Sequence, residues 1–161
     1  MHCPVIPGGD FTMEIIGGSC RFGLWFVHVW WNDKTVHRVR FSRTGIPGSV
    51  PELIQRYCAG HVLNLSQLDT PAIWEDTVYS RIYRAVQQVP YGSTSTYGEI
   101  AARTGTSPRV VGQAMARNPV PLIIPCHRIV AAGGIGGFSS PLEIKEALLT
   151  MEKKGLRKGV K

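Results

Sequence analysis

The hydrophobic pattern of this 161-residue chain changes character near residue 76. Before that point, aromatic and β-branched residues crowd together over 22–31, a turn sequence follows at 32–34, and apolar residues alternate with polar ones over 35–41. This pattern predicts a β-hairpin. Apolar residues then recur at helical spacing over 51–58, which predicts a helix. We therefore expect a small α/β domain over residues 1–75, with a linker at about 61–75 where no strong period is present.

Residues 76–161 have the spacing of a second, mainly α-helical domain. Thr96 and Glu99 form a capping-box sequence at the start of one helix, Gly105 ends it, and Pro108 suits the first turn of the next. Two short helices joined by about four residues around a glycine are typical of a helix-turn-helix. Many ordinary helical hairpins share this pattern, so it does not by itself indicate DNA binding.

The formal charge of +7 is concentrated in the second half. Residues 1–76 contain six Lys/Arg and seven Asp/Glu, whereas residues 77–161 contain twelve Lys/Arg and four Glu. A basic half beside a neutral one favours a polyanionic partner, although a soluble surface that is simply basic fits equally well. No apolar run approaches the roughly 20 residues that span a bilayer, and residues 1–10 lack the pattern of a secretory signal. We expect a soluble cytoplasmic protein (nucleoid-associated, or nuclear in a eukaryote) with no membrane partner.

An apolar stretch punctuated by prolines, residues 118–125, leads directly into Cys126-His127-Arg128. Proline fixes φ and removes a hydrogen-bond donor, so this backbone is expected to be pre-organised. A thiol attacks as the thiolate. His127 can take its proton, directly or through a water, and Arg128 adds positive potential. The alternative is a buried structural cysteine. The remaining cysteines, Cys3, Cys20 and Cys58, form no CxxC pair and are expected to be free thiols.

Six short motifs occur in order over the second half. They are Pro90-Tyr91-Gly92, Thr96-Tyr97-Gly98, Arg109-Val110-Val111-Gly112, Asn118-Pro119, Pro125-Cys126-His127-Arg128 and Gly136-Gly137-Phe138-Ser139. In these motifs residues 77–155 resemble the O6-alkylguanine-DNA alkyltransferases, also called methylated-DNA–protein-cysteine methyltransferases. Residues 1–76 are similar only in general character to the variable, RNase H-like α/β domain of such proteins. The resemblance implies a monomeric DNA repair protein that moves the alkyl group of O6-alkylguanine in double-stranded DNA onto its own cysteine, irreversibly and once per molecule, without a cofactor.

The resemblance also implies roles for individual residues. Cys126 is the alkyl acceptor, His127 is a base acting through water, and Glu152 orients the imidazole. Asn118 braces the helix-turn-helix against the loop that carries the cysteine, and Tyr97 donates to the guanine ring and helps to protonate the leaving base. Glu152 could instead be one more solvated glutamate of a C-terminal helix.

Substrate binding is implied for the residues around the flipped base. Ser139 hydrogen-bonds the alkylated oxygen, next to Phe138 in the same motif. The main-chain carbonyls of Cys126 and Ile129 receive the guanine amino group, which adenine and thymine lack. After Ser139 the family usually continues with two glycines, whereas this chain has Ser140-Pro141. That departure changes the loop that lines the base pocket, so tolerance of bulky adducts and of free-base inhibitors stays open.

For DNA binding, the resemblance implies that Arg109 enters the base stack when the target nucleotide is flipped out, since its reacting atom is inaccessible inside a duplex. The small residues Gly112 and Ala114 let the second helix approach the minor groove, where little sequence is read. Arg128 could instead be structural. The further candidates for phosphate contact are Arg103, Arg117 and Arg128.

Some relatives bind structural zinc in the first domain, but the spacing of the candidate ligands here is not that of a compact zinc motif. We therefore expect no metal site. The residues considered are His2, Cys3, Cys20, His28 and His37.

Two other functions are alternatives to alkyl transfer. A non-enzymatic damage sensor on the same scaffold lacks the acceptor cysteine, so Cys126 argues against it. A Cys-His hydrolase would turn over thioesters, but a thioether is not hydrolysed in that way, and the helix-turn-helix pattern and Arg109 would be left without a role.

Overall fold

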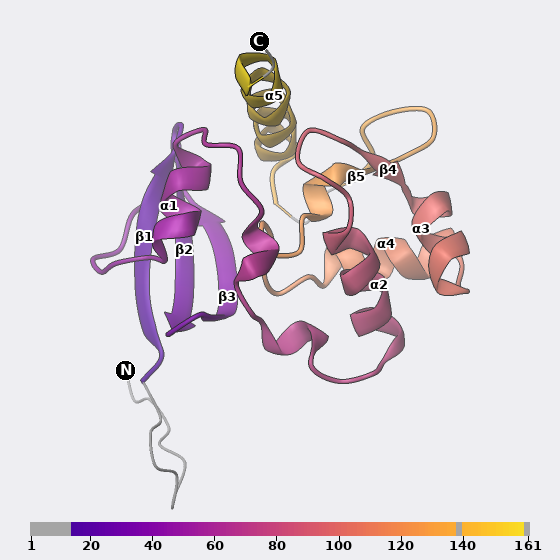
Figure 1. The fold of residues 1–161 in the computed structure, drawn as a ribbon, viewed down its shortest axis with the longest axis horizontal. Coiled ribbons are helices and arrows are strands. Elements are labelled where there is room, and N and C mark those ends of the chain that lie inside the picture. Colours follow the sequence, from indigo (N-terminus) through magenta and orange to yellow (C-terminus); the bar gives the residue numbers. More distant parts are fainter. Residues whose placement is uncertain (1–13, 138–139, 160–161) are drawn as a thin grey trace, which may run out of the picture.

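The computed structural model describes residues 14–137 and 140–159, and Figure 1 shows a sheet with one short helix beside a group of helices. Strands β1 (Ile16–Phe22), β2 (Trp25–Asn32) and β3 (Thr35–Ser42) form an antiparallel sheet in the order β1-β2-β3. Helix α1 (Glu52–Cys58) packs against the sheet and buries Ile54 and Tyr57. The expected small sheet plus helix is therefore present in the first half.

The predicted hairpin is β2 and β3, but β1 was not expected from the sequence. Gly17 and Gly18 lower the strand signal there, because glycine has no side chain to pack on a sheet. The structure gives a reason for Gly18: a Cβ at this position would lie 2.1 Å from the carbonyl oxygen of Ser49. Glycine thus allows the chain that leads into α1 to cross directly over the strand.

The expected linker over 61–75 follows the edge of the sheet. It contains two 3-10 turns, η1 (Leu65–Gln67) and η2 (Pro71–Ile73). Between them Asp69 pairs with the start of β3: Val36 N–H donates to Asp69 O at 2.7 Å, and Asp69 N–H donates to Lys34 O at 2.8 Å. The segment is therefore attached to the sheet before it reaches the helices.

The second half contains the helices α2 (Val78–Gln87), α3 (Tyr97–Thr104), α4 (Pro108–Ala116) and α5 (Leu142–Gly159). The predicted capping box is present at α3, where Thr96 accepts from the Glu99 N–H and Glu99 accepts from the Thr96 N–H. Gly105 ends α3 with φ 69°. Pro108 occupies the first turn of α4, as expected.

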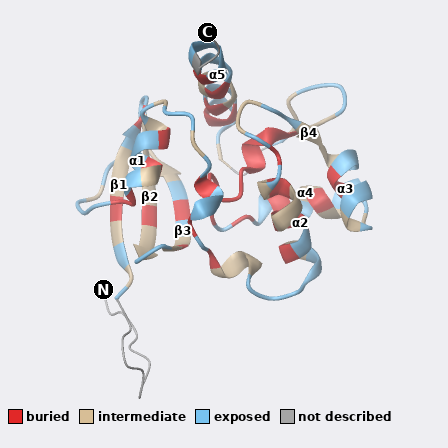
Figure 2. Ribbon diagram, viewed as in Figure 1, coloured by how far each residue is buried: buried red, intermediate tan, exposed pale blue. Residues whose placement is uncertain are grey.

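The hydrophobic core continues from one half into the other, and Figure 2 shows buried residues on both sides and in the chain between them. Two short strands, β4 (Ser95–Thr96) and β5 (Ile129–Val130), pair in parallel near the start of α3. Val39 N–H in β3 donates to Pro119 O at 3.0 Å. Within the described part of the chain, no helix combines the length and the apolar character needed to cross a membrane.

Candidate active site

The proline-punctuated loop between α4 and Cys126 is buried and braced from within. Asn118 Nδ2 donates to Ile124 O at 2.8 Å, and Asn118 Oδ1 accepts from Val120 N–H at 3.0 Å. Leu122 has φ 79°, a conformation that a non-glycine residue keeps only where its surroundings enforce it. The loop therefore presents the following residues, Cys126–Arg128, as a fixed 3-10 turn, η3.

Cys126 is only 3% exposed, and burial raises the pKa of its thiol to about 11. A hydrogen bond from Asn118 and the positive charge of Lys145 act in the opposite direction but do not outweigh burial. The thiol is therefore neutral near pH 7. Nucleophilic chemistry at this sulfur requires a base that removes its proton as the new bond forms.

His127 has the bonding of such a base. Its Nε2 lies 2.8 Å from Glu152 Oε2, with both side chains buried. Burial lowers the pKa of His127, and the bond and charge of Glu152 only partly restore it, so the ring is neutral near pH 7. With Nε2–H donated to the carboxylate, Nδ1 is left as a proton acceptor, and it has no hydrogen-bond partner among the described residues.

Glu152, on α5, is the centre of a buried polar network. Arg128 donates to it through Nε, at 2.9 and 3.2 Å, and through Nη2, at 2.8 Å; Gly92 N–H adds a bond of 3.0 Å. Burial alone would raise the pKa of Glu152, but hydrogen bonds and charges from His127 and Arg128 outweigh it and hold the pKa well below its usual range. The glutamate is therefore ionised, as an orienting group requires.

The burial of Arg128 contradicts the prediction that it contacts phosphate. The residue is 7% exposed, it pairs with Glu152, and its Nη1 donates to Val89 O at 2.9 Å. Its guanidinium is thus used inside the protein, and the structural role left open by the sequence is the one this geometry supports.

Tyr57 was not expected at the site, yet α1 carries it there from the first half of the chain. Its hydroxyl donates to Glu152 Oε2 at 2.5 Å and lies 3.3 Å from His127 Nε2. Burial, followed by the charge of Glu152, raises the pKa of Tyr57 well above its ordinary value, so it stays a donor. A contact between residues so far apart in the chain has no local sequence signal.

Lys145 was also missed. Its fully buried ammonium donates to Ile129 O at 2.7 Å and to Gly137 O at 2.8 Å, and thereby ties β5 to the glycine-rich loop, residues 133–137. Burial lowers the pKa of Lys145, while the charge that Cys126 would carry raises it. A sequence signal did exist, because Lys145, Leu148 and Glu152 recur on one face of a helix.

The structure describes some of the expected substrate-binding residues. The Tyr97 hydroxyl donates to Gly137 O at 3.4 Å, and a Cβ at Gly136 would lie 3.0 Å from the Tyr97 ring, so the glycine-rich loop passes against this tyrosine. Ile129 O already accepts from Lys145, although a carbonyl has a second lone pair. The predicted pocket residues Phe138 and Ser139 lie outside the described residues.

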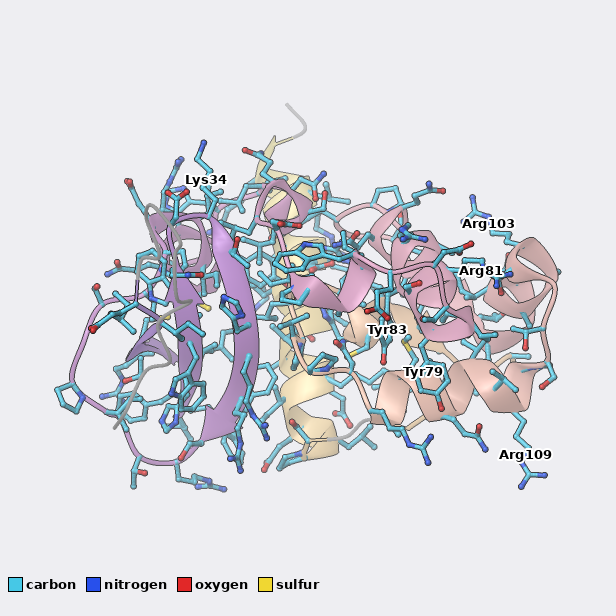
Figure 3. All side chains as sticks on the ribbon, turned by 90° about the horizontal axis from the view of Figure 1, so that it is seen from below. Lys34, Tyr79, Arg81, Tyr83, Arg103 and Arg109 are labelled. Atoms are coloured by element: carbon cyan, nitrogen blue, oxygen red, sulfur yellow. The ribbon has the colours of Figure 1, made fainter. Side chains whose placement is uncertain are left out.

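Three of the expected DNA contacts lie exposed or half-buried on α3 and α4. Arg109 is exposed at the start of α4, and a Cβ at Gly112 would meet nothing within 4 Å. Arg103 is exposed as well, but Figure 3 shows that Arg103 and Arg109 project from opposite sides of the helices. A flat partner surface that contacts one of these arginines would therefore not contact the other.

Two further expected DNA contacts differ in position. Ala114 is completely buried, with its carbonyl accepting from the Tyr83 hydroxyl at 2.9 Å, so its side chain faces the core and not a partner. Arg117, just after α4, is exposed and donates to the Tyr79 hydroxyl at 2.8 Å. Arg117 therefore stays available to a partner, whereas Ala114 does not.

The described residues contain no group of three His, Cys, Asp or Glu able to hold a metal ion. Among the zinc ligands considered, His28 is bonded to Thr44 O at 2.6 Å and His37 to Asn32 Oδ1 at 2.7 Å. His2 and Cys3 lie outside the described residues. Both histidines therefore form hydrogen bonds within the protein, as ordinary structural side chains do.

Comparison with known proteins gives one family. Residues 77–154 match the family described as 6-O-methylguanine DNA methyltransferase, DNA binding domain. A methylated-DNA–protein-cysteine methyltransferase of Saccharolobus islandicus is 49% identical over 71 residues, 44% of this chain and 47% of that protein. One from Sulfolobus acidocaldarius is 45% identical over 84 residues, 52% of this chain and 54% of that protein. The chain thus spans about half the length of the curated relatives it matches.

Two solved structures are similar over most of the chain. The O6-methylguanine-DNA methyltransferase of Pyrococcus kodakaraensis aligns with a TM-score of 0.66 and 26% identity, covering 84% of this chain and 97% of that one. The Mycobacterium tuberculosis OGT in complex with DNA aligns with a TM-score of 0.69 and 25% identity, covering 86% of this chain and 93% of that one. The fold of both halves is therefore similar to that of alkyltransferases.

Proposed function

We propose that the protein repairs alkylated guanine in DNA by transferring the alkyl group to Cys126, because residues 77–154 match the family described as 6-O-methylguanine DNA methyltransferase, DNA binding domain. The observation that carries this proposal is the bonding of His127. Nε2 of His127 is bonded to the ionised Glu152, and Nδ1 has no hydrogen-bond partner among the described residues, so the residue that directly follows Cys126 can accept a proton. A merely structural cysteine would not need this arrangement.

The reaction balances without a cofactor. The Cys126 proton passes to His127 Nδ1, directly or through a water, and the sulfur attacks the alkyl carbon as the bond from that carbon to guanine O6 breaks. The departing guanine takes up one proton from Tyr97, and the proton that His127 received from Cys126 replaces it, so that both side chains end neutral. The product is a thioether, which is not hydrolysed like a thioester, so each molecule acts once.

Double-stranded DNA is the proposed partner. We assign α3 and α4 as a helix-turn-helix whose second helix enters the minor groove, with Arg109 filling the stack left by the flipped base. The exposed Arg109, the open space above Gly112 and the excess of basic residues in 77–161 support this assignment. The sheet and α1 would belong to the RNase H-like first domain, over residues 1–75, of a monomeric protein that is cytoplasmic (nucleoid-associated, or nuclear in a eukaryote).

The test is to mix the protein with a duplex that contains one O6-methylguanine, record the intact mass, and map the modified peptide. We expect a gain of one methylene per protein, on Cys126, and no gain in Cys126→Ser. Tight binding to the lesion without a mass gain would instead identify a damage sensor. Turnover of an acyl ester with no alkylated protein would indicate the hydrolase.

A further inference from the structure

A basic groove lies between the edge of the sheet and the C-terminal end of α4. It has a volume of about 490 Å³, and its charged lining residues are Arg38 and Arg40 of β3 and Arg117 after α4. None of the described residues that line it is acidic. The first half of the chain, which carries no net positive charge of its own, thus contributes two of the three cations.

The strand geometry fixes both β3 arginines on one side. Val39 between them is 3% exposed and points into the core, and successive side chains of a strand alternate between faces. Arg38 and Arg40 are therefore neighbours on the outer face, about 7 Å apart along the strand. Both residues are exposed.

The backbone joins this strand directly to the proposed DNA-binding helix. Val39 N–H donates to Pro119 O at 3.0 Å, and Pro119 follows Arg117 by two residues. β3 is an edge strand of the sheet, so the side facing α4 is not covered by another strand. Arg109 and Arg117 are exposed near opposite ends of α4, and Arg117 shares the groove with the two β3 arginines.

Among the described residues, no carboxylate forms an ion pair with the arginines of this groove. In the described part of the chain, the ion pairs of arginine involve Arg43, Arg81 and Arg128. Arg117 packs its guanidinium on the Tyr79 ring, 6.0 Å from the ring centre, and keeps most of its donors free. Groups of arginines without a carboxylate favour a polyanion, and phosphate oxygens suit the guanidinium fork.

We propose that Arg38 and Arg40 bind the phosphate backbone of duplex DNA on one flank of the base presented to Cys126. The proposal rests on the proposed function, because that function supplies the duplex on α4. It adds that the first half of the chain takes part in DNA binding and does more than support the site. Since phosphate contacts carry no base information, the gain is in affinity and not in sequence preference.

The test uses the full chain and an unmodified duplex of two to three helical turns, so that binding does not depend on alkyl transfer. The variant is Arg38→Gln/Arg40→Gln. The matched control is Arg43→Gln/Arg56→Gln, which removes two exposed positive charges from the same half but outside the groove. Affinity is measured across a fourfold range of salt concentration.

Two lost phosphate contacts should reduce the slope of log affinity against log salt by about 2. Over fourfold salt the wild-type protein should lose about tenfold more affinity than the groove variant. The control pair should keep the wild-type slope, and Arg38→Lys/Arg40→Lys, which retains the charge, should keep most of it. Equal slopes in the groove variant and wild type, or an equal loss in both pairs, would overturn the proposal.

A second measurement separates this proposal from the proposed function. Alkylation of Cys126 by O6-alkylguanine as the free base needs no DNA, so the groove variant should react with it at the wild-type rate. This result also shows that the variant is folded. Failure of wild type to become alkylated on Cys126 by a duplex that contains O6-methylguanine would count against alkyl transfer, while the salt slopes on unmodified duplex would still decide on the groove.

Discussion

The interior around Glu152 and the outer surface of α4 both rely on arginine, but in opposite ways. Arg128 is 7% exposed and uses Nε, Nη1 and Nη2 in bonds to Glu152 and Val89. Arg109 is exposed and has no ion pair within the described residues. A buried charge whose partner is removed destabilises a protein by about 3–5 kcal/mol. An exposed pair is worth about 0–1 kcal/mol.

This contrast predicts two classes of variant. Changes in the interior network should alter the chemistry at Cys126 or the free energy of unfolding, with any substrate. Changes on the surface should alter only reactions that involve DNA. A surface variant that unfolds the protein, or an interior variant that affects DNA alone, would break the distinction.

The largest effect is expected for His127→Gln. Removing a general base typically slows a reaction by about 10²–10⁴-fold. The pH dependence should change as well. In wild type the lowered pKa of His127 keeps the base form populated, so the alkylation rate should fall only below about pH 6.5. In the variant only thiolate formed by direct ionisation reacts, so the rate should rise about tenfold per pH unit toward pH 11.

Intact mass at timed intervals, with free O6-alkylguanine as substrate, measures this rate without DNA. Gln113→Ala, an exposed change on α4, serves as the control and should keep the wild-type profile. A flat profile in His127→Gln would mean that another group removes the proton.

The next effect is on stability, in Glu152→Gln. The amide leaves Arg128 buried without a counter-ion, which should lower the free energy of unfolding by about 3–5 kcal/mol. The folded pKa of Glu152 is held below its ordinary value of 4.5, so its contribution is fully present above that pH and is lost as the pH falls further. The difference between wild type and variant should thus be constant above about pH 5 and shrink below pH 4.5.

Chemical denaturation over this pH range gives the difference. Glu143→Gln is the matched control, because Glu143 pairs with Arg43 at 3.8 Å on the surface. It should cost less than about 1 kcal/mol. Equal costs for the two glutamates would remove the distinction between interior and surface.

A surface effect of about 1–3 kcal/mol is expected for Arg109→Ala, seen as a five- to 150-fold slower reaction with duplex substrate. Its reaction with the free base and its unfolding should match wild type within about 0.5 kcal/mol. Arg103→Ala is the comparison, since Figure 3 shows Arg103 on the other side of the helices. A larger loss for Arg103→Ala than for Arg109→Ala would mean that the DNA lies on the other face from the one proposed.

Much of the helical half could be predicted because its signals are local. The Thr96–Glu99 capping box, Gly105 and Pro108 act within a few residues and define α3 and α4. β1 could not be predicted, because its glycines weaken the strand pattern. Gly18 is required there by the close approach of Ser49, which exists only in the folded chain.

The site followed the same rule. Cys126 and His127 are adjacent, so their chemistry is readable in the sequence, and the resemblance supplied Glu152. Nothing local distinguishes the buried Arg128 from the exposed Arg109, because exposure depends on packing of distant segments. Tyr57 was missed for that reason, since α1 brings it to α5 from the other half of the chain.

The smallest effect, from Tyr57→Phe, tests whether the first half positions the reacting groups. Glu152 keeps its bonds from His127 and Arg128, so the loss in unfolding free energy should be about 1 kcal/mol. With one donor fewer, the carboxylate becomes a stronger acceptor for His127. The pKa of His127 should then rise, which moves the acid limb of the alkylation rate to higher pH with the free base as substrate.

Tyr83→Phe is the matched control for this prediction. Tyr83 is buried too, but its hydroxyl donates to the backbone carbonyl of Ala114 and not to the Glu152 network. It should cost a similar free energy of unfolding while leaving the pH profile in place. If both variants leave the acid limb unmoved, Tyr57 only packs, and the interior network ends at Glu152. A shift in Tyr57→Phe alone extends that network into the sheet-bearing half, where Arg38 and Arg40 of β3 are proposed to bind DNA.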